Sequence, residues 1–227
     1  MKNNIVSTEK GSKSAYDSLK ALYFSGKVKP ALNKIITELE NDPNQLDLIL
    51  LACQCLLRGK DFEQLAVYAD KAINLDDQNA QGYYFKGMAL KHAKGNEQEA
   101  LKMFKMALDL EPENVLFLQA KAETHLALFK DYHLPMQIAD KQRIKGEECL
   151  NQIVSLVEQK ENPTYHENLI MADVSITINK NIDAKMYYIR AVDAFNAAPK
   201  EEQNKNIYKD IIKAQNACNR LMQKFTE

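Results

Sequence analysis

One stretch of the sequence, residues 83–114, constrains the fold more than any other. It reads YYFKGMALKHAKGNEQEALKMFKMALDLEPEN. Apolar residues recur at spacings of three and four on both sides of Gly95, which predicts two short amphipathic helices joined by a turn. Gly95 can adopt the left-handed conformation that ends a helix, and Pro112 cannot continue the second one. Small residues stand where the two helices would cross and would let the backbones approach: Gly87, Ala100 and Ala107.

The same stretch resembles a tetratricopeptide repeat (TPR). That family's pattern runs aromatic, Gly, apolar, Ala, aromatic, Ala and Pro over about 34 residues. This order is matched by Tyr83, Gly87, Leu90, Ala100, Phe104, Ala107 and Pro112. The interval from Gly87 to Gly95 is one residue longer than usual, so we expect an extra residue in the turn. The resemblance implies an all-α fold, a right-handed α-α superhelix of stacked helix pairs.

Copies of the pattern recur along the chain. The interval from Ala31 to Pro43 is 12 residues (43 − 31), the same as from Ala100 to Pro112 (112 − 100). We therefore expect about five helix pairs in residues 12–199. The expected repeats are residues 12–44, 45–79, 80–113, 114–163 and 164–198. Residues 1–11 are polar and aperiodic, and a flexible N-terminal tail is expected there.

Two segments depart from the repeat. Ala100 to Cys149 is 49 residues (149 − 100), about 15 more than one period, so an insertion is expected near residues 130–146. We interpret it as an extended helix whose charged first turns project beyond the stack, with Gly146 as a candidate kink. Residues 200–227 predict a long C-terminal helix that caps the last repeat. Its apolar residues follow spacings of 4, 3, 4, 3 and 4, which leaves a self-association seam open as the alternative: Ile207, Ile211, Ala214, Cys218, Leu221 and Phe225.

No motif in the sequence points to chemistry. A Gly-rich phosphate loop, a nucleophile elbow and a metal-ligand motif are all absent, so we expect no catalytic residue, no metal, no cofactor and no enzymatic activity. Cys53 and Cys55 stand two apart on an expected helix and cannot both reach one metal ion, which favours buried thiols. The formal net charge of −1 favours neither nucleic acid nor a membrane surface. With no secretory signal, no membrane-spanning apolar run and few cysteines, a cytoplasmic location is expected.

The resemblance also implies a binding surface. In TPR proteins the first helices of successive repeats line a concave groove that holds an extended or helical peptide. Mapping the exposed side of these helices gives the candidate partner-binding residues Tyr16, Lys20, Tyr23, Gln54, Tyr84, Met88, Lys91, Gln119 and Glu123. The same stripes also include Lys13, Leu50, Leu57, Leu126, Leu169, Asp173 and Ile176.

The early stripes are basic and aromatic, which predicts an acidic or amphipathic segment as the ligand. The alternative is that these tyrosines and leucines pack between helices and that the lysines are only solvated. Some co-chaperones clamp a C-terminal carboxylate with Lys, Asn and Arg side chains. Near those positions this chain has Tyr16, Lys20 and Leu51, and Lys86 alone fits, so a carboxylate clamp is not expected.

The sequence therefore predicts a protein-binding scaffold or adaptor, with a protein or peptide as its partner. Two alternatives remain open. One is a structural self-assembly module that forms a homo-oligomer through the C-terminal or the inserted helix. The other is a chaperone for secreted substrates, although TPR proteins of that kind are usually shorter.

Overall fold

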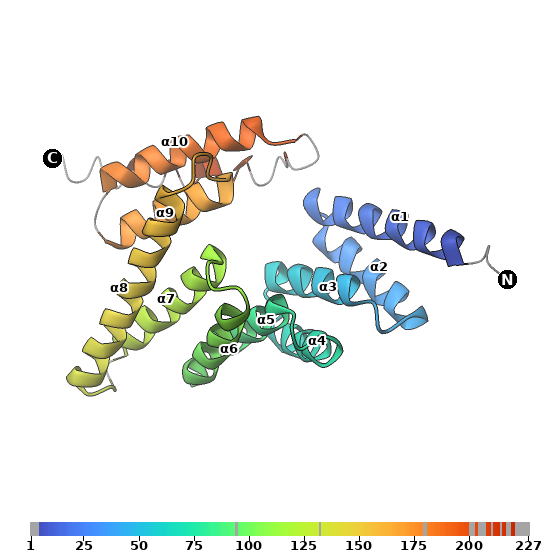
Figure 1. The fold of residues 1–227 in the computed structure, drawn as a ribbon, viewed down its shortest axis with the longest axis horizontal. Coiled ribbons are helices and arrows are strands. Elements are labelled where there is room, and N and C mark those ends of the chain that lie inside the picture. The colour runs from blue at the N-terminus through green and yellow to red at the C-terminus, as the bar shows by residue number, and fades with distance from the viewer. Residues whose placement is uncertain are drawn as a thin grey trace. The chain divides into compact units, whose positions relative to one another are not determined.

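The computed structural model of the 227-residue chain describes residues 5–93, 95–131, 133–178 and 181–199, together with a few residues between 203 and 220. In these residues the regular structure is α-helical throughout, as Figure 1 shows, and it forms five successive helix pairs. The chain divides into two compact units, Met1–Leu110 (unit 1) and Glu111–Glu227 (unit 2). The all-α fold of stacked helix pairs expected from the sequence is confirmed.

Unit 1 contains three helix pairs. They are α1 (Ile5–Phe24) with α2 (Val28–Asn41), α3 (Leu46–Gly59) with α4 (Phe62–Leu75), and α5 (Ala80–Lys91) with α6 (Glu97–Leu110). Besides its own partner, each first helix packs against the next first helix, α1 on α3 and α3 on α5. The second helices α2 and α4 also pack on the first helix that follows them. This arrangement repeats one contact pattern along the chain, as a solenoid requires.

Unit 2 contains two helix pairs. They are α7 (Val115–Phe129) with α8 (Met136–Glu158), and α9 (Tyr165–Thr177) with α10 (Asn181–Ala197). The first helices α7 and α9 are again neighbours, and α8 also contacts α9. Unit 2 therefore repeats the contact pattern of unit 1.

Small residues permit the helix crossings. In the third pair, Ala100, Phe104 and Ala107 are completely buried. A Cβ atom on Gly87 would lie 2.5 Å from Cε1 of Phe104, closer than two non-bonded carbon atoms approach. In the fifth pair, Ala172 of α9 packs against Ala184 and Tyr188 of α10 in the same manner. The TPR positions therefore have the packing role that the sequence pattern predicts.

A matched pair of glycine substitutions tests this crossing. We expect Gly87→Ala to lower the free energy of unfolding by about 1–2 kcal/mol, because overpacking against Phe104 outweighs the gain in helix propensity. Gly59, at the end of α3, has no atom within 4 Å of its built Cβ, and Gly59→Ala should leave stability unchanged or raise it. Urea denaturation followed by circular dichroism at 222 nm measures both changes. Equal effects at the two sites would contradict the close crossing.

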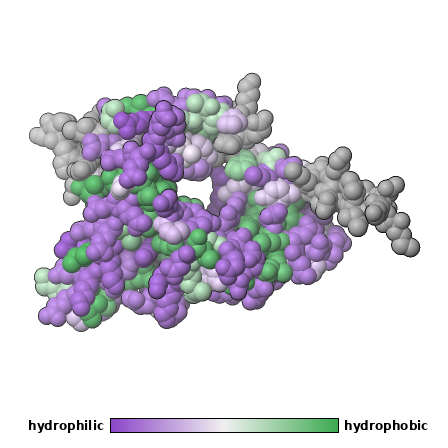
Figure 2. Space-filling view, in the orientation of Figure 1, coloured by the Kyte–Doolittle hydropathy of each residue, from purple (hydrophilic) through white to green (hydrophobic). Residues whose placement is uncertain are grey.

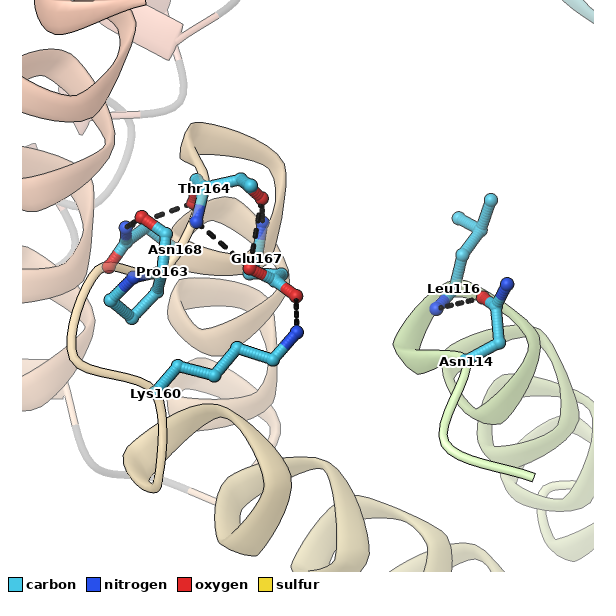
Figure 3. Close-up of polar contacts among 7 residues, drawn as sticks. All are labelled: Asn114, Leu116, Lys160, Pro163, Thr164, Glu167 and Asn168. Atoms are coloured by element: carbon cyan, nitrogen blue, oxygen red, sulfur yellow. Dashed lines mark hydrogen bonds and ion pairs between the residues drawn. The ribbon is translucent and has the colours of Figure 1, made fainter. Parts of the chain in front are cut away.

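Polar side chains cap the first helices α5, α7 and α9 at their N-terminal ends. Asn114 accepts a hydrogen bond from the Leu116 backbone N–H at the start of α7. At the start of α9, the Thr164 hydroxyl accepts from the Glu167 backbone, and the Glu167 carboxylate accepts from the Thr164 backbone (Figure 3). Lys160 also forms an ion pair with Glu167. These caps satisfy backbone donors that a helix start leaves unpaired.

Two boundaries differ from the sequence-based expectation. Helix α1 begins at Ile5, seven residues before the expected start (12 − 5), so the helix extends into the stretch expected to be a tail. Residues 5–11 contain no proline, so no residue of this stretch prevents the helix from beginning before residue 12. Gly95 has the expected positive φ of 83°, but α5 ends four residues earlier, at Lys91 (95 − 91).

The insertion lengthens one helix, whose turns from Ala139 onward are buried on one side. Helix α8 has 23 residues, nine more than the 14 of α6 (23 − 14). The expectation that its early turns project is wrong from Ala139 onward, because Ala139 and Gln142 are buried. The charged residues of these turns lie on the other side of the helix, and α8 runs through Gly146 without a break. A Cβ on Gly146 would lie 2.8 Å from Cγ of Leu126, so this glycine permits a close approach to α7.

The expected C-terminal helix falls largely outside the described residues. This holds for Ile207, Ala214, Cys218, Leu221 and Phe225. Ile211 is described, is completely buried, and belongs to one apolar cluster with Tyr165, Ala191 and Phe195. The ring of Tyr208 lies 5.8 Å from that of Phe195. These two residues pack against the last helix pair.

Candidate protein-binding surface

In the first helices α3, α5, α7 and α9 more than half of the residues are buried. In α3, eight of the 14 residues are buried, because α1, α2, α4 and α5 all pack around it. The side chains that stay at least partly open recur at helical spacing along one line: Asp47, Gln54, Leu57 and Arg58. In α5 the corresponding line holds Gln81, Met88 and Lys91. We call each such line a first-helix stripe.

In unit 1 the stripes of α1, α3 and α5 belong to neighbouring helices. α1 packs against α3 and α3 packs against α5. Tyr16 and Tyr23 on α1 are half-buried and Lys20 between them is exposed. Figure 2 shows hydrophilic residues over most of the face in view, with hydrophobic residues in smaller groups between them. A surface of half-buried aromatic residues and cations therefore lies along the first helices of unit 1.

Cations of this surface lie against aromatic rings. The Arg58 guanidinium carbon of α3 lies 5.6 Å from the centre of the Tyr23 ring of α1. The Lys20 Nζ lies 6.0 Å from the Tyr16 ring and 5.9 Å from the Phe24 ring. Tyr23 and Phe24 meet edge to face at 5.4 Å. Such cation–π contacts hold flexible basic side chains near one position.

Two tyrosines of α1 lie near opposite ends of α3, Tyr16 near Asp47 and Tyr23 near Arg58. Burial raises the pKa of Tyr16, and Asp47 and Asp17 add to the rise. Burial also raises the pKa of Tyr23, while its contact with Arg58 opposes the rise. Asp47 stands at the start of α3 and Arg58 at its end. The two helices therefore run in the same direction, with an acidic beginning and a basic end.

The end of α5 belongs to the same region as the end of α3. The rings of Phe62 and His92 are stacked with 4.0 Å between their centroids. Phe62 begins α4, three residues after α3 ends at Gly59 (62 − 59), and His92 directly follows α5. This contact and that of Arg58 with Tyr23 place the C-terminal ends of α1, α3 and α5 near one another.

The structure separates the residues expected on the stripes into open and buried ones. The open or half-buried members in unit 1 are Tyr16, Lys20, Tyr23, Gln54, Leu57, Met88 and Lys91. The expectation that Tyr84 and Leu50 are open is wrong, because they are only 6% and 8% exposed. The ring of Tyr84 lies 6.2 Å from that of Phe104, so it fills the space beside the helix crossing. Lys13 lies among the residues whose side chains are not described.

In unit 2 the stripes of α7 and α9 are acidic. Glu123 and Asp173 are exposed, and Gln119, Leu126, Leu169 and Ile176 are half-buried. Although Asp173 is exposed as a whole residue, partial burial of its carboxyl group raises the pKa of that group, a hydrogen bond from Tyr188 opposes the rise, and Glu123 adds to it. The Tyr188 hydroxyl lies 3.3 Å from Asp173 Oδ1. These stripes of unit 2 therefore present acidic side chains, whereas those of unit 1 also carry the cations Lys20, Arg58 and Lys91.

Sequence reasoning missed Arg58 as a member of this surface. The signal was present, because Arg58 follows Gln54 by four residues and so lies on the same stripe.

Lys86, the one residue that fitted a carboxylate clamp, forms an ion pair with Asp70 of the second helix α4, with 2.6 Å between Nζ and Oδ2. The structure therefore gives no support to a clamp at Lys86.

The buried cysteines have the character of small hydrophobic residues. Cys53, Cys55 and Cys149 are free and buried. Burial raises the pKa of Cys53 to about 12 and that of Cys55 to about 11, which disfavours the reactive thiolate.

Among the residues described here, no group of three His, Cys, Asp or Glu side chains could hold a metal ion. Of the helices described, none combines the length and the apolar character needed to cross a membrane.

Comparisons with known proteins address the fold. No protein-family model matches the chain, and no curated protein matches it. Among solved structures, a thermophilic TPR protein from Thermus thermophilus is similar, with a TM-score of 0.63 and 16% identity over 88% of this chain and 98% of that chain. A TPR protein from Parabacteroides merdae has a TM-score of 0.62 and 13% identity over 88% and 69% of the two chains.

A third solved structure is MamA from Desulfovibrio magneticus, from residue 41 to its end. It has a TM-score of 0.52 and 14% identity over 83% of this chain and 97% of that chain. At these identities the likeness concerns the fold alone. The helix pairs, the small residues at their crossings and these structural neighbours agree that the chain has the tetratricopeptide-repeat fold.

Proposed function

We propose that this protein is a protein-binding scaffold or adaptor whose first-helix stripes in unit 1 hold a segment of a partner protein. The observation that supports this most is the packing of α1, α3 and α5 side by side, each open along one stripe. The stripes together offer a longer surface than any single helix could. In this proposal the protein positions its partner and catalyses no reaction.

The residues on the surface suit a protein ligand. Tyrosine combines a large apolar ring with a polar tip, and tyrosine and arginine are enriched at the energetic centres of interfaces. Tyr16 and Tyr23 expose part of their rings, and Met88 can adapt its flexible side chain to different partners. With Lys20 and Arg58 among them, these residues favour an acidic or amphipathic segment.

The chain offers a matched control for the experiment. Tyr16 and Lys20 form a tyrosine–lysine contact on the first helix α1, with 6.0 Å between Nζ and the ring centre. Tyr68 and Lys71 form the same kind of contact on the second helix α4, at 4.8 Å. The double variants Y16A/K20A and Y68A/K71A therefore remove the same two types of side chain, one pair from a first helix and the other from a second helix.

We expect capture of the partner to depend on the first helices. Partner recovered from the native cell by the tagged protein should fall by about tenfold or more with Y16A/K20A, because loss of an interface centre costs more than about 1.4 kcal/mol. Y68A/K71A should recover the partner as wild type does. Quantitative mass spectrometry compares the three samples after circular dichroism has confirmed their folding. Loss of the partner with Y68A/K71A alone would contradict the proposal.

We also propose that residues 200–227 cap the last helix pair. Ile211 is completely buried against Tyr165, Ala191 and Phe195, so this position of the apolar stripe is already used within the chain. If the apolar stripe of residues 200–227 packs within the chain in this way, it is not available to a second copy. Light scattering should therefore give a constant monomer mass across a hundredfold range of protein concentration. A mass that doubles with concentration would favour the self-assembly alternative instead.

A further inference from the structure

We infer that the C-terminal ends of α1 and α3 form a subsite for a carboxylate side chain of the partner segment, with Arg58 and Lys20 as its cations. The inference rests on the proposed function, since it names the chemistry of the segment that the same surface would hold. It goes beyond a general preference for acidic partners, because it assigns the acidic residue to one end of the stripes.

The first observation concerns charge. Within the part of the chain that the structure describes, no carboxylate oxygen lies within 4 Å of the Lys20 or Arg58 nitrogen atoms. Four cations elsewhere in the described residues already have such a partner: Lys86, Lys102, Arg143 and Lys160. Lys20 and Arg58 therefore keep their charge available for an acidic group from another molecule.

The second observation concerns position. Arg58 contacts the ring of Tyr23, and Lys20 contacts the rings of Tyr16 and Phe24. These contacts restrict both side chains before a ligand arrives and so reduce the entropy lost on binding. A guanidinium has five N–H donors, and its contact with a single tyrosine leaves most of them for a carboxylate.

The third observation concerns direction along the stripes. Asp47 stands at the start of α3 and lies near Tyr16, where its charge helps to raise the pKa of the Tyr16 hydroxyl. Arg58 lies at the opposite end of α3, in its last turn. A carboxylate would be repelled at the first end and attracted at the second. The apolar rings of Tyr23 and Phe24 beside Arg58 would take an apolar or aromatic residue next to that carboxylate.

Three labelled peptides of one sequence frame test the subsite. Their sequences are EELFEE, QQLFQQ and KKLFKK, so only the charge changes. Fluorescence anisotropy gives their affinities, and amide NMR shifts of the 15N-labelled protein locate the site. We expect the glutamate peptide to bind about tenfold or more tighter than the glutamine peptide, with affinity that falls as salt is raised. Its shifts should centre on Tyr23 and Arg58.

Charge reversal gives the decisive variants. Arg58→Glu and Lys20→Glu should each weaken the glutamate peptide by about tenfold, and Arg58→Glu should favour the lysine peptide instead. Lys71→Glu is the control, because Lys71 also lies over a tyrosine, Tyr68, but on the second helix α4. It should leave the preference for the glutamate peptide unchanged.

Several outcomes would overturn the subsite. They are equal binding of the three peptides, absence of binding by all three, shifts centred away from Tyr23 and Arg58, or an unchanged preference in Arg58→Glu. None of them decides the scaffold proposal, which stands or falls separately on partner capture by Y16A/K20A and Y68A/K71A. The two proposals can therefore fail independently.

Discussion

Replacing Phe104 by alanine is expected to lower the free energy of unfolding by about 3–5 kcal/mol, the largest single effect we foresee. Phe104 is completely buried and lies against Gly87 at the crossing of α5 and α6. The ring of Tyr84 lies beside it, 6.2 Å between centroids. Because glycine has no side chain to move into the space, the cavity left by the lost ring would stay largely open.

Met106 supplies the control on the same helix. It lies two residues after Phe104 but is 41% exposed. Met106→Ala should change stability by no more than about 0.5 kcal/mol, as is usual for exposed positions. The chain has no tryptophan, so urea denaturation is best followed by circular dichroism at 222 nm. If the two variants were equally destabilised, Phe104 would not be the residue that holds the third helix pair together.

The second large effect concerns a buried polar pair in unit 2. His125 Nδ1 of α7 lies 2.6 Å from Gln142 Oε1 of α8, and both residues are buried. Gln142→Leu leaves the imidazole without this partner and should cost about 1–3 kcal/mol. The double variant H125L/Q142L removes both polar groups, and we expect it to recover most of that loss. Additive losses in the double variant would show that the two residues do not act as a pair.

The same pair should make stability depend on pH. Burial lowers the pKa of His125 below its ordinary value of 6.5, and Lys121 and Lys145 add to the effect, while the Gln142 hydrogen bond and Glu148 oppose it. The unfolded chain therefore binds a proton at a higher pH than the folded protein does. Above about pH 6.5 the histidine is neutral in both states and does not lower the free energy of unfolding. As the pH falls below 6.5, protonation favours the unfolded chain and the free energy of unfolding decreases.

Denaturation midpoints between pH 5 and pH 8 measure this dependence. Wild type should become less stable toward pH 5, and H125L/Q142L should show a smaller change over the same range. An identical pH dependence in the two proteins would mean that other groups cause the acid sensitivity.

The sequence predicted the helix pairs well because small residues at crossings leave a direct trace. Ala100, Phe104 and Ala107 stand at fixed spacings, and each is buried as the pattern requires. The pattern says less about which side of a first helix stays open. Tyr84 lies on the expected stripe but packs beside Phe104, because a large ring near the crossing gains more from burial than from exposure.

The inserted helix could not be placed from composition. The early part of α8 is rich in charged residues, which suggested that it projects from the stack. Its buried side is formed by Ala139, Gln142 and Gly146, at spacings of three and four, and none of these is a large apolar residue. A polar residue that pairs across the interface, as Gln142 does with His125, cannot be told from a solvated one without its partner's position.

The arrangement of cations is likewise a tertiary feature. Arg58 and Tyr23 are 35 positions apart in the sequence (58 − 23), and only the packing of α1 on α3 brings them together. The charge difference between the stripes of the two units was visible in the sequence through Lys20, Glu123 and Asp173. The aromatic contacts that hold the cations in place were not visible in the sequence.

Site-specific photocrosslinking tests the central claim most directly. A benzophenone amino acid placed at Gln54, on the stripe of α3, or at Val67, on the exposed side of α4, samples the two faces within one unit. The account predicts that a partner in the native cell crosslinks strongly through position 54 and weakly or not at all through position 67. Crosslinks through position 67 with none through position 54 would contradict it.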